Sequence, residues 1–462
     1  MKEYDVAIIG AGSGGLTAAY TAKGFSKKVI LIDKNKPGGE CTWSGCIPSK
    51  ALINIAKEIY AARKYSDIKV DTGEVLEKVR KIISNVYEEE TPEVLKRDGI
   101  DYINGFAKFI GKNTLNVNGE EIKAKKIFIS TGSSPMVPPI EGLKDVNYLT
   151  NENIFLEGKL PESIIVLGGG AIGVELSQAM NRLGVKVSLV EMMDTILNKE
   201  EPKLIAMLER KLRSEGVNLY TSCKAEKVSE EYGKVSLSVV KDGSVEVIIA
   251  DKILVCLGRI PNIKGLDLEK VSVIYNKKAI EVNAYLETST KGIFAIGDVA
   301  GPYLFSHMAN VHGITAVQNA LLPIKKKINY SHVAWCTFSD PELARAGFTE
   351  QEAREKYGDS IRVYEQDYKN LDRSKTKEND EGIVKIICDK KGKVLGASIL
   401  GDRAGEIISE IQVVKTLGIN FGKLTKVIHP YPTYGEILLK ISKKVYLDNI
   451  LNNSFVKLFR KK

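Results

Sequence analysis

The sequence predicts an α/β protein with two Rossmann-like dinucleotide-binding units, followed by a C-terminal α+β domain. The chain has 462 residues, enough for about three domains. A glycine-rich strand–turn–helix pattern occurs twice, first near residue 10 and again near residue 168. The residues beyond 331 instead alternate short β-runs with one long helical pattern, which is typical of an antiparallel sheet covered by helices.

The first unit begins at the N-terminus, where the β-run YDVAIIG leads into a turn containing Gly10, Gly12, Gly14 and Gly15. A helical stretch and a second apolar strand ending at Asp33 follow. In such a fingerprint the first glycine allows the tight turn, and the second lets backbone N–H groups approach a pyrophosphate. The third lets helix and strand pack closely, and the terminal acid can accept from a ribose hydroxyl. A first dinucleotide site is predicted here.

The second unit repeats this order in SIIVLGGGAIGVELSQAMNRLGVKVSLVE, with Gly168, Gly170, Gly173 and the terminal acid Glu191. The spacing from first glycine to acid is the same in both copies, since 33 − 10 and 191 − 168 both equal 23. Two dinucleotides are therefore predicted, with a vestigial second copy as the alternative.

Glu191 favours NADH over NADPH as the second dinucleotide. A carboxylate at this place accepts from the 2′-hydroxyl of NADH and repels the 2′-phosphate of NADPH. The alternative is that Arg182 or Lys186 reaches across to bind a 2′-phosphate.

Three further apolar strands end in glycine, and we expect the loops beyond them to face bound ligand. They occupy residues 126–135, 252–262 and 292–301. Asp298, in AIGDV, is suited to holding a sugar-like hydroxyl, and a plain turn-forming aspartate is the alternative.

The order of these patterns predicts the domain boundaries. The first unit covers 1–148 and returns at 272–328, the second covers 149–271, and the C-terminal domain covers 331–462. The polar stretch KKKINY at 325–330 marks the last boundary.

Cys41 and Cys46 are the one local pair among six cysteines. Residues five apart do not share a face of an ideal helix, so a disulfide between them requires a distortion, for which Gly45 and Pro48 are suited. A thiolate near a helix start and close to Lys50 would be stabilised. Zinc spacing is absent from the sequence, and a structural disulfide is the alternative.

Composition excludes several other classes of protein. The longest apolar runs fall short of the 18 or so residues of a transmembrane helix, and the acidic N-terminus predicts an early strand rather than a secretory signal. We therefore expect a cytoplasmic protein. The net charge of +9 reflects either a Lys-rich proteome or an anionic partner, but no nucleic-acid-binding pattern is present.

The segment GGECTWSGCIPSK resembles the redox-active signature of the class I pyridine nucleotide–disulfide oxidoreductases. These flavoproteins include dihydrolipoamide dehydrogenase, glutathione reductase and mercuric reductase. Both fingerprints, AIGDV and a terminal PT-plus-Glu motif occur in the family's order, so the resemblance spans essentially the whole chain. It implies FAD in the first unit, NAD(H) in the second, and a C-terminal domain that forms a homodimer.

The resemblance also implies roles for individual residues. Cys46 would contact the flavin, Cys41 would exchange with substrate, and Lys50 would lie beside the flavin with Glu175 as its ion-pair partner. Without the resemblance, Lys50 would be interpreted as a surface charge, Glu175 as a charge on a helix face, and His307 as a core or interface histidine. The residues implied around the cofactors are Gly10, Gly12, Gly14, Gly15, Asp33, Lys50, Thr131, Gly132, Gly168, Gly170, Gly173, Glu191, Gly258, Asp298, His307 and Ala309.

The sequence departs from this family near its C-terminus. Dihydrolipoamide dehydrogenase and glutathione reductase carry a histidine directly before Pro-Thr, with a glutamate five residues later. Here Tyr431 occupies that place, His429 lies two residues earlier, and Glu436 is present. Tyrosine, with an ordinary pKa near 10, is a poor base at neutral pH. Mercuric reductase also needs a C-terminal cysteine pair, whereas this chain has no cysteine after Cys388.

The predicted activity is electron transfer from NADH through FAD and the Cys41–Cys46 disulfide to a disulfide or another oxidant. The alternatives are dihydrolipoamide oxidation in the reverse direction, and a redox-sensing flavoprotein with slow turnover.

Apolar residues recur at helical spacing in the C-terminal tail, with basic residues at its end. We favour a helix packed on its own domain or on a dimer mate over contact with an anionic membrane. The residues concerned are Val445, Leu447, Ile450, Leu451, Phe455, Leu458 and Phe459, with Lys457, Arg460, Lys461 and Lys462.

Overall fold

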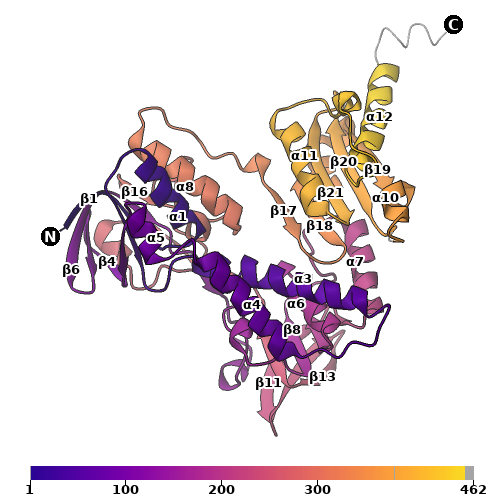
Figure 1. Ribbon diagram of the computed structural model, residues 1–462, viewed down its shortest axis with the longest axis horizontal. Coiled ribbons are helices and arrows are strands. Elements are labelled where there is room, and N and C mark those ends of the chain that lie inside the picture. Colours follow the sequence, from indigo (N-terminus) through magenta and orange to yellow (C-terminus); the bar gives the residue numbers. More distant parts are fainter. Residues whose placement is uncertain (1, 379, 453–462) are drawn as a thin grey trace.

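The computed structural model describes residues 2–378 and 380–452, and it has three lobes (Figure 1). The indigo N-terminal residues share the first lobe with a later segment around α8. The magenta segment forms the second lobe and the orange-to-yellow C-terminal segment the third. This arrangement confirms the predicted fold class, and the residue boundaries of the domains stay a prediction.

The first lobe is built on a seven-stranded sheet in the order β3-β2-β1-β6-β5-β4, with β16 also paired to β6. The strands β3, β2, β1, β6 and β16 run parallel to one another. The strand β5 pairs antiparallel with both β6 and β4. The strands are β1 (Lys2–Ile9), β2 (Val29–Asp33), β3 (Asp101–Asn104), β4 (Ala107–Gly111), β5 (Thr114–Val117), β6 (Glu120–Ile129) and β16 (Ile293–Ala295). The helices of the first lobe are α1 (Ser13–Gly24), α2 (Gly39–Trp43), α5 (Pro92–Arg97) and α8 (Ser306–Leu321). Two more helices, α3 (Cys46–Ala62) and α4 (Thr72–Tyr87), extend from this lobe over the second one (Figure 1).

The second lobe holds a four-stranded parallel sheet in the order β10-β9-β8-β14 and a three-stranded antiparallel sheet in the order β11-β12-β13. A short antiparallel pair, β7 with β15, joins it to the first lobe. The elements are β7 (Ser133–Pro135), β8 (Ser163–Leu167), α6 (Ala171–Arg182), β9 (Lys186–Val190), α7 (Pro202–Ser214), β10 (Asn218–Tyr220), β11 (Lys224–Glu231), β12 (Lys234–Lys241), β13 (Ser244–Ala250), β14 (Lys252–Val255) and β15 (Arg259–Pro261).

The third lobe is a five-stranded antiparallel sheet in the order β17-β18-β21-β20-β19. Its elements are β17 (Ala334–Thr337), β18 (Glu342–Gly347), α9 (Glu350–Tyr357), β19 (Ile361–Asp367), α10 (Asp372–Lys375), β20 (Ile383–Asp389), β21 (Val394–Gly401), α11 (Ala404–Thr416) and α12 (Glu436–Leu451). Short 3-10 helices complete the chain: η1 (Leu143–Asp145), η2 (Ile154–Leu156), η3 (Leu268–Val271), η4 (Gly297–Ala300), η5 (Tyr330–His332), η6 (Gly358–Ser360), η7 (Tyr368–Asn370) and η8 (Phe421–Lys426).

The helix α3 joins the first two lobes, because its buried face packs on the second one. Leu52 and Ile55 of α3 belong to the same apolar core as Val174 and Leu176 of α6. Since α3 begins at Cys46, this packing holds the redox motif between the two dinucleotide-binding units.

The C-terminal helix α12 is packed for most of its length but not at its end. Val445 is fully buried, whereas Leu447 is 55% exposed and Ile450 and Leu451 are each 36% exposed. The C-terminal apolar residues were expected to pack on their own domain, and this is found for the first of them, Val445. The rest of the predicted stripe, from Phe455 onward, lies outside the described residues. Between residues 2 and 378 and between 380 and 452, no helix has the length and apolar character needed to cross a membrane.

Candidate active site

The two glycine-rich turns have the same local geometry. Gly10 has φ +105°, and a Cβ there would lie 2.2 Å from the Ser130 carbonyl oxygen. A Cβ on Gly15 would lie 1.8 Å from the Gly10 carbonyl oxygen, so α1 can cross β1 only if this residue is glycine. Gly12 precedes α1 without a capping side chain, which leaves the first N–H groups of the helix available to an anion.

The second turn repeats each of these features. Gly168 has φ +109°, and a Cβ on Gly173 would lie 1.9 Å from the Gly168 carbonyl oxygen. Gly170 precedes α6 without a capping side chain, and a Cβ there would meet nothing within 4 Å. Both turns thus place N–H groups without a side-chain cap at a helix N-terminus, which fits the pyrophosphate of a dinucleotide.

The acids that end the two fingerprints each hold their own turn. Asp33 Oδ2 accepts from the Ala11 backbone N–H at 2.6 Å, and Glu191 Oε2 accepts from the Gly169 N–H at 2.7 Å. Both bonds span 22 residues, and the second oxygen of each acid accepts from an N–H two residues farther along, at 2.8 Å. Each carboxylate keeps lone pairs for a ribose hydroxyl, because a carboxylate can accept about four hydrogen bonds.

The short segments that follow two of the glycine-ended strands, β7 after β6 and β15 after β14, pair where the first two lobes join. Thr131 Oγ1 donates to the Asn262 carbonyl oxygen at 2.7 Å, and Gly132 and Gly258 take positive φ on the two sides of the β7–β15 pair. Gly14 lies against Ala309, since a Cβ there would lie 3.3 Å from the Ala309 carbonyl oxygen.

Asp298 lies in a polar network that also reaches the redox motif. Its Oδ2 accepts from Ser133 Oγ at 2.6 Å, and Arg259 Nε donates to the same hydroxyl at 2.7 Å. Arg259 in turn forms an ion pair with Glu40, whose Oε1 accepts from Asn151 at 2.6 Å. Sequence reasoning missed Arg259 and Glu40, although each adjoins a residue that it singled out.

The two cysteines lie on different helices. Cys41 lies in the short helix α2, and α3 begins at Cys46. The helical conformation is interrupted between them, at Ser44 and Gly45. The expected distortion is therefore a complete break. A Cβ on Gly45 would lie 2.9 Å from the Glu40 carbonyl oxygen, which favours glycine at the break.

Both thiols are free in this structure, and each has a defined place. Cys46 Sγ lies 3.5 Å from Ser306 Oγ, at the first residue of α8. Cys46 therefore sits at the N-termini of two helices, α3 and α8, whose dipoles favour negative charge.

The electrostatics separate the two thiols. The hydrogen bond from Cys41, a second from Ser306 and the charge of Lys50 lower the pKa of Cys46 to about 6. The same hydrogen bond, together with burial, raises the pKa of Cys41 well above its ordinary value. In the dithiol state Cys46 is thus the thiolate and Cys41 the proton donor to it.

Lys50 and Glu175 are brought together by the packing of α3 on α6. Lys50 Nζ lies 2.7 Å from Glu175 Oε2, and Glu175 is only 4% exposed. Glu175 Oε1 accepts from the Phe338 backbone N–H at 2.7 Å, and Lys50 Nζ lies 4.7 Å from the centre of the Phe338 ring. This trio joins one residue from each of the three lobes.

Trp43, for which the sequence offered no role, anchors the redox loop. Its Nε1 donates to the Pro37 carbonyl oxygen at 2.8 Å, and its ring packs on Tyr87 with 4.8 Å between centroids. The Lys36 ammonium lies over the same ring, 5.2 Å from its centre. The residue thus ties α2 to the end of α4.

The C-terminal segment lies apart from the cysteines of the same chain, on the far side of the third lobe around α10 and α12 (Figure 1). Tyr431 is 69% exposed and donates to Asp372 at 2.9 Å, a bond that raises the pKa of the tyrosine. Glu436 lies 3.6 Å from Lys440 rather than on Tyr431. His429 contacts Glu410 at 3.0 Å.

Two histidines of α8 differ in exposure. His307 is exposed and stacks on Phe305, with 5.2 Å between ring centroids. His312, which sequence reasoning missed, is fully buried, and burial lowers its pKa to about 4. Its Nδ1 accepts from the Gly297 N–H at 3.2 Å, so a neutral His312 supports the turn that carries Asp298.

Arg182 does not reach the dinucleotide cradle of the second unit. It forms buried ion pairs with Glu215 at 2.6 Å and with Asp340 at 2.7 Å, and it lies over the Tyr60 ring. The alternative in which Arg182 binds a 2′-phosphate is therefore excluded.

Comparison with known proteins agrees with this geometry. Residues 4–322 match the family model described as pyridine nucleotide-disulphide oxidoreductase, and residues 333–441 match the dimerisation domain of the same family. The chain belongs to the pyridine nucleotide-disulphide oxidoreductase family. It is accordingly an FAD-dependent oxidoreductase that uses NAD(H), which confirms the predicted cofactors and enzyme class.

Several relatives of this oxidoreductase match over nearly the whole chain. A dihydrolipoyl dehydrogenase of Thermus scotoductus is 35% identical over 97% of this chain and 99% of its own. A mercuric reductase of Staphylococcus aureus is 31% identical over 94% of this chain and 81% of its own. Among solved structures, the Cu(II) complex of the HOCl-induced flavoprotein disulfide reductase RclA from Escherichia coli has TM-score 0.88 and 28% identity. It covers 96% of this chain and 100% of its own.

Proposed function

We propose that this oxidoreductase uses NADH to reduce a disulfide substrate through Cys41 and Cys46. The observation that carries the proposal is the position of Cys46, at two helix N-termini and near Lys50, where a thiolate is stabilised. The electron chemistry between NADH and the Cys41–Cys46 disulfide is what bound FAD supplies.

The thiol chemistry follows from the different protonation of the two cysteines. Cys41 attacks one sulfur of the substrate disulfide, the substrate S–S bond breaks, and one thiol leaves. The proton of Cys41 can pass along its hydrogen bond to the Cys46 thiolate, which makes up for the missing histidine base. Cys46 passes this proton to the first departing sulfur, and the Cys46 thiolate then attacks Cys41 in the mixed disulfide. The second substrate sulfur leaves and takes up a proton from solvent, which restores the Cys41–Cys46 disulfide. NADH, a proton and one disulfide thus yield NAD⁺ and two thiols.

Dihydrolipoamide oxidation is the alternative, and the names of several relatives favour it. That direction needs a base to deprotonate the incoming dithiol. Tyr431 fills this place poorly, because its hydroxyl donates to Asp372 and its pKa is raised. We therefore favour reduction of a disulfide.

We further propose a homodimer in which Tyr431 and Glu436 complete the active site of the other subunit. Glu436 Oε2 is buried and has no hydrogen-bond partner among the described residues. A buried carboxylate oxygen left without a partner is costly, so a partner chain that supplies a donor would stabilise it.

Two anaerobic assays test the proposal. The first follows NADH oxidation with a panel of disulfides and quinones, and the second follows NAD⁺ reduction with dihydrolipoamide. We expect disulfide-dependent turnover that Cys41→Ser abolishes, with little dihydrolipoamide oxidation. Quinone reduction that survives Cys41→Ser, with no disulfide turnover, would show instead that substrate reacts directly at the flavin.

A further inference from the structure

A recess of about 560 Å³ opens on the first lobe at the point where α8 ends. Its walls come from β6, from β16 with the residues before it, and from the end of α8 with the residues after it. The mechanism proposed above uses none of its residues. We call it the basic recess, and its lining includes Lys126, Glu287, Lys291, Asn319, Leu322 and Lys325.

The basic recess has an excess of positive charge. Three of its four charged residues are lysines, and the fourth is Glu287. Glu287 is already occupied, because its Oε2 lies 3.4 Å from Lys325 Nζ and its Oε1 accepts from the Gly292 N–H at 3.1 Å. Among the described residues, no carboxylate forms an ion pair with Lys126 or Lys291. The ammonium groups of these two lysines are therefore available to an anion.

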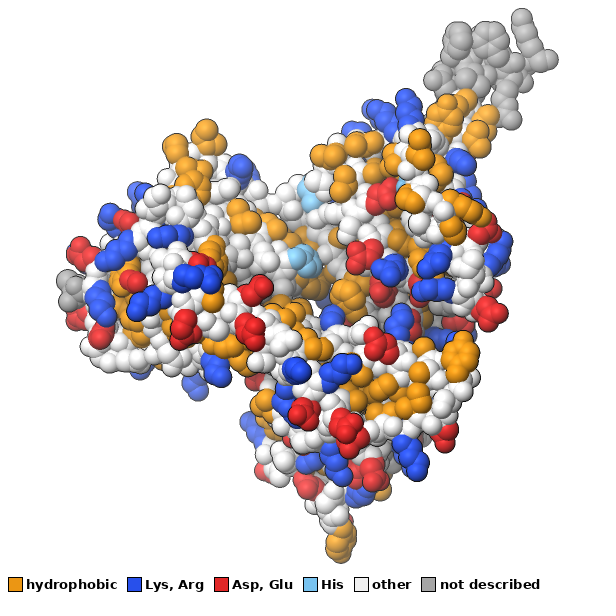
Figure 2. Space-filling model, viewed as in Figure 1, with side chains coloured by type: hydrophobic (Ala, Val, Ile, Leu, Met, Phe, Trp, Pro, Cys, Tyr) orange, Lys and Arg blue, Asp and Glu red, His pale blue; other side chains and the backbone are white. Residues whose placement is uncertain are grey.

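An exposed apolar segment forms the rim of the basic recess. Leu322 is 40% exposed and Ile324 is 79% exposed, and Pro323 between them is exposed as well. The lysines at 325–327 follow directly and are also exposed. Figure 2 shows hydrophobic side chains projecting at the top of the first lobe, where the chain leaves α8 in Figure 1. Apolar and cationic side chains thus lie next to each other on this surface.

Asn319 fixes the shape of this rim. Its side chain is buried, and its Nδ2 donates to the carbonyl oxygens of Tyr285 at 3.1 Å and Lys326 at 2.9 Å. Its Oδ1 accepts from the Lys326 N–H at 2.7 Å, so one side chain holds both ends of the turn. Because Ile324 lies on a turn that is already ordered, its contact with an apolar phase costs little backbone entropy.

We propose that the basic recess and its apolar rim bind the surface of an anionic phospholipid membrane. The ammonium groups of Lys126 and Lys291 would meet a headgroup phosphate, and Leu322 and Ile324 would enter the boundary of the acyl chains. Charge and hydrophobicity together select this partner. A free phosphate would satisfy the lysines but would leave the apolar rim in water, whereas an anionic bilayer offers a match for both. This contact is independent of the substrate that the enzyme reduces.

Co-sedimentation of the FAD-loaded full chain with phospholipid vesicles tests the electrostatic part of this inference. We expect binding to vesicles of equal parts phosphatidylglycerol and phosphatidylcholine, but not to phosphatidylcholine alone. Lys126→Gln/Lys291→Gln should weaken the binding about 25-fold, because each lysine near an anionic surface contributes about fivefold. The matched control is Lys123→Gln/Lys125→Gln, which removes the same charge from two lysines of β6 that already pair with carboxylates. No binding to the anionic vesicles, or an equal loss in both variants, would overturn the inference.

A second comparison tests the apolar rim with the same vesicles. Ile324→Ser should weaken binding about tenfold, because the isoleucine no longer enters the acyl boundary. Ile249→Ser removes an isoleucine that is 63% exposed on the second lobe, and it should leave binding unchanged. The C-terminal tail is the same in every variant, and equal FAD content and thermal unfolding confirm that each variant is folded. Unchanged binding of Ile324→Ser, with inorganic pyrophosphate displacing the protein from the vesicles, would show a site for soluble anions and overturn the membrane assignment.

Discussion

Lys50 Nζ and Glu175 Oε2 lie 2.7 Å apart and join the redox helix α3 to the second dinucleotide-binding unit. The other oxygen of Glu175 accepts from the Phe338 N–H, so the same carboxylate also reaches the C-terminal lobe. A movement that separates these groups would therefore change the surroundings of Lys50, on the helix that begins at Cys46.

Glu175→Gln should weaken both the fold and the turnover. The substitution leaves Lys50 without its counter-charge, but Lys50 is 36% exposed, so the loss stays below that of a fully buried pair. We expect the free energy of unfolding to fall by about 2 kcal/mol and disulfide-dependent kcat to fall about tenfold. Denaturant unfolding and steady-state rates measure the two effects.

Glu226→Gln is the matched control for that variant. Glu226 pairs with Lys224 at 3.2 Å on the exposed edge of the second lobe, where an ion pair contributes less than about 1 kcal/mol. An equal effect of both substitutions would contradict a special role for Glu175.

The thiolate of the reduced enzyme should form as the pH rises through about 6, because that is the pKa to which Cys46 is lowered. Below this pH the sulfur is protonated, so thiolate absorbance should be lost on acidification. Ser306→Ala removes one stabilising hydrogen bond and should move the midpoint upward by about 1 unit. Ser409→Ala removes an exposed hydroxyl of α11 that donates to the Gly405 carbonyl oxygen, and it should not move the midpoint. A wild-type midpoint near 9 would contradict the assignment.

NADH should be preferred over NADPH, and the preference should depend on Glu191. Arg182 is held by Glu215 and Asp340, so it offers no cation to a 2′-phosphate. We expect Glu191→Gln to lower the ratio of kcat/KM for NADH to that for NADPH about tenfold. Asp194→Asn, an exposed neighbouring acid, should leave the ratio nearly unchanged. A wild-type preference for NADPH would mean that Glu191 does not face the ribose.

Gly15→Ala should prevent stable FAD binding to the first unit. The added methyl group would lie 1.8 Å from the Gly10 carbonyl oxygen, so α1 must move away from β1. This movement would also displace the glycine-rich turn that precedes α1. Gly24→Ala, at the far end of α1 with nothing within 4 Å, is the control. We expect one FAD per chain in the wild type and in the control, and a colourless protein for Gly15→Ala. An equally yellow Gly15→Ala protein would contradict this account of the turn.

Much of this architecture could be predicted because its determinants are local in sequence. The two fingerprints require glycine for reasons confined to one strand, one turn and one helix, so Gly10, Gly15, Gly168 and Gly173 identify them directly. The link between Lys50 and Glu175 spans 125 residues, and only the family resemblance pointed to it.

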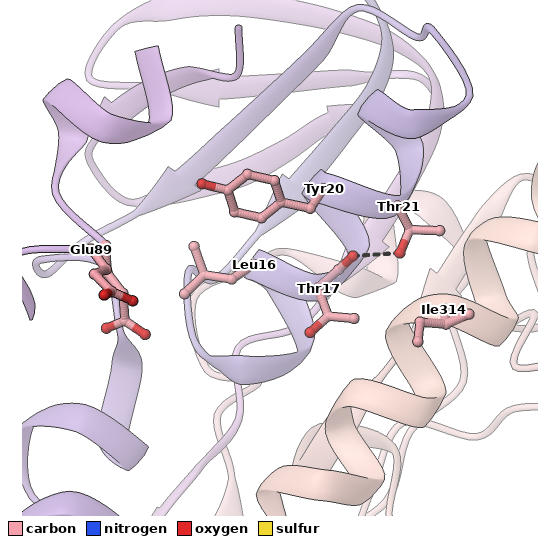
Figure 3. A pocket seen from close by; sticks show the side chains of 7 residues that line it. Leu16, Thr17, Tyr20, Thr21, Glu89 and Ile314 are labelled. Carbon is pink, nitrogen blue, oxygen red and sulfur yellow. Dashed lines mark hydrogen bonds between the residues drawn. The ribbon is translucent and has the colours of Figure 1, made fainter. Parts of the chain in front are cut away.

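The rest of the site depends on contacts that no local pattern encodes. Arg259 reaches Glu40 across 219 residues, and His312 supports the turn of Asp298 from within a helix that reads as ordinary core. A surface recess lined by Leu16, Glu89 and Ile314 combines residues from α1, α8 and the segment after α4, and no single segment marks it (Figure 3). The spacing of the cysteines implied a distorted first helical turn, whereas at Gly45 the helix is interrupted completely.

The most direct test of the central claim is the long-wavelength thiolate–flavin absorption of two cysteine variants. If Cys46 is the thiolate beside the flavin and Cys41 the exchanging thiol, Cys41→Ser should show this band before any reduction. Cys46→Ser should then lack the band even after two-electron reduction by NADH. The band in Cys46→Ser, or full disulfide turnover in both variants, would contradict the assignment of Cys41 and Cys46 as the redox centre.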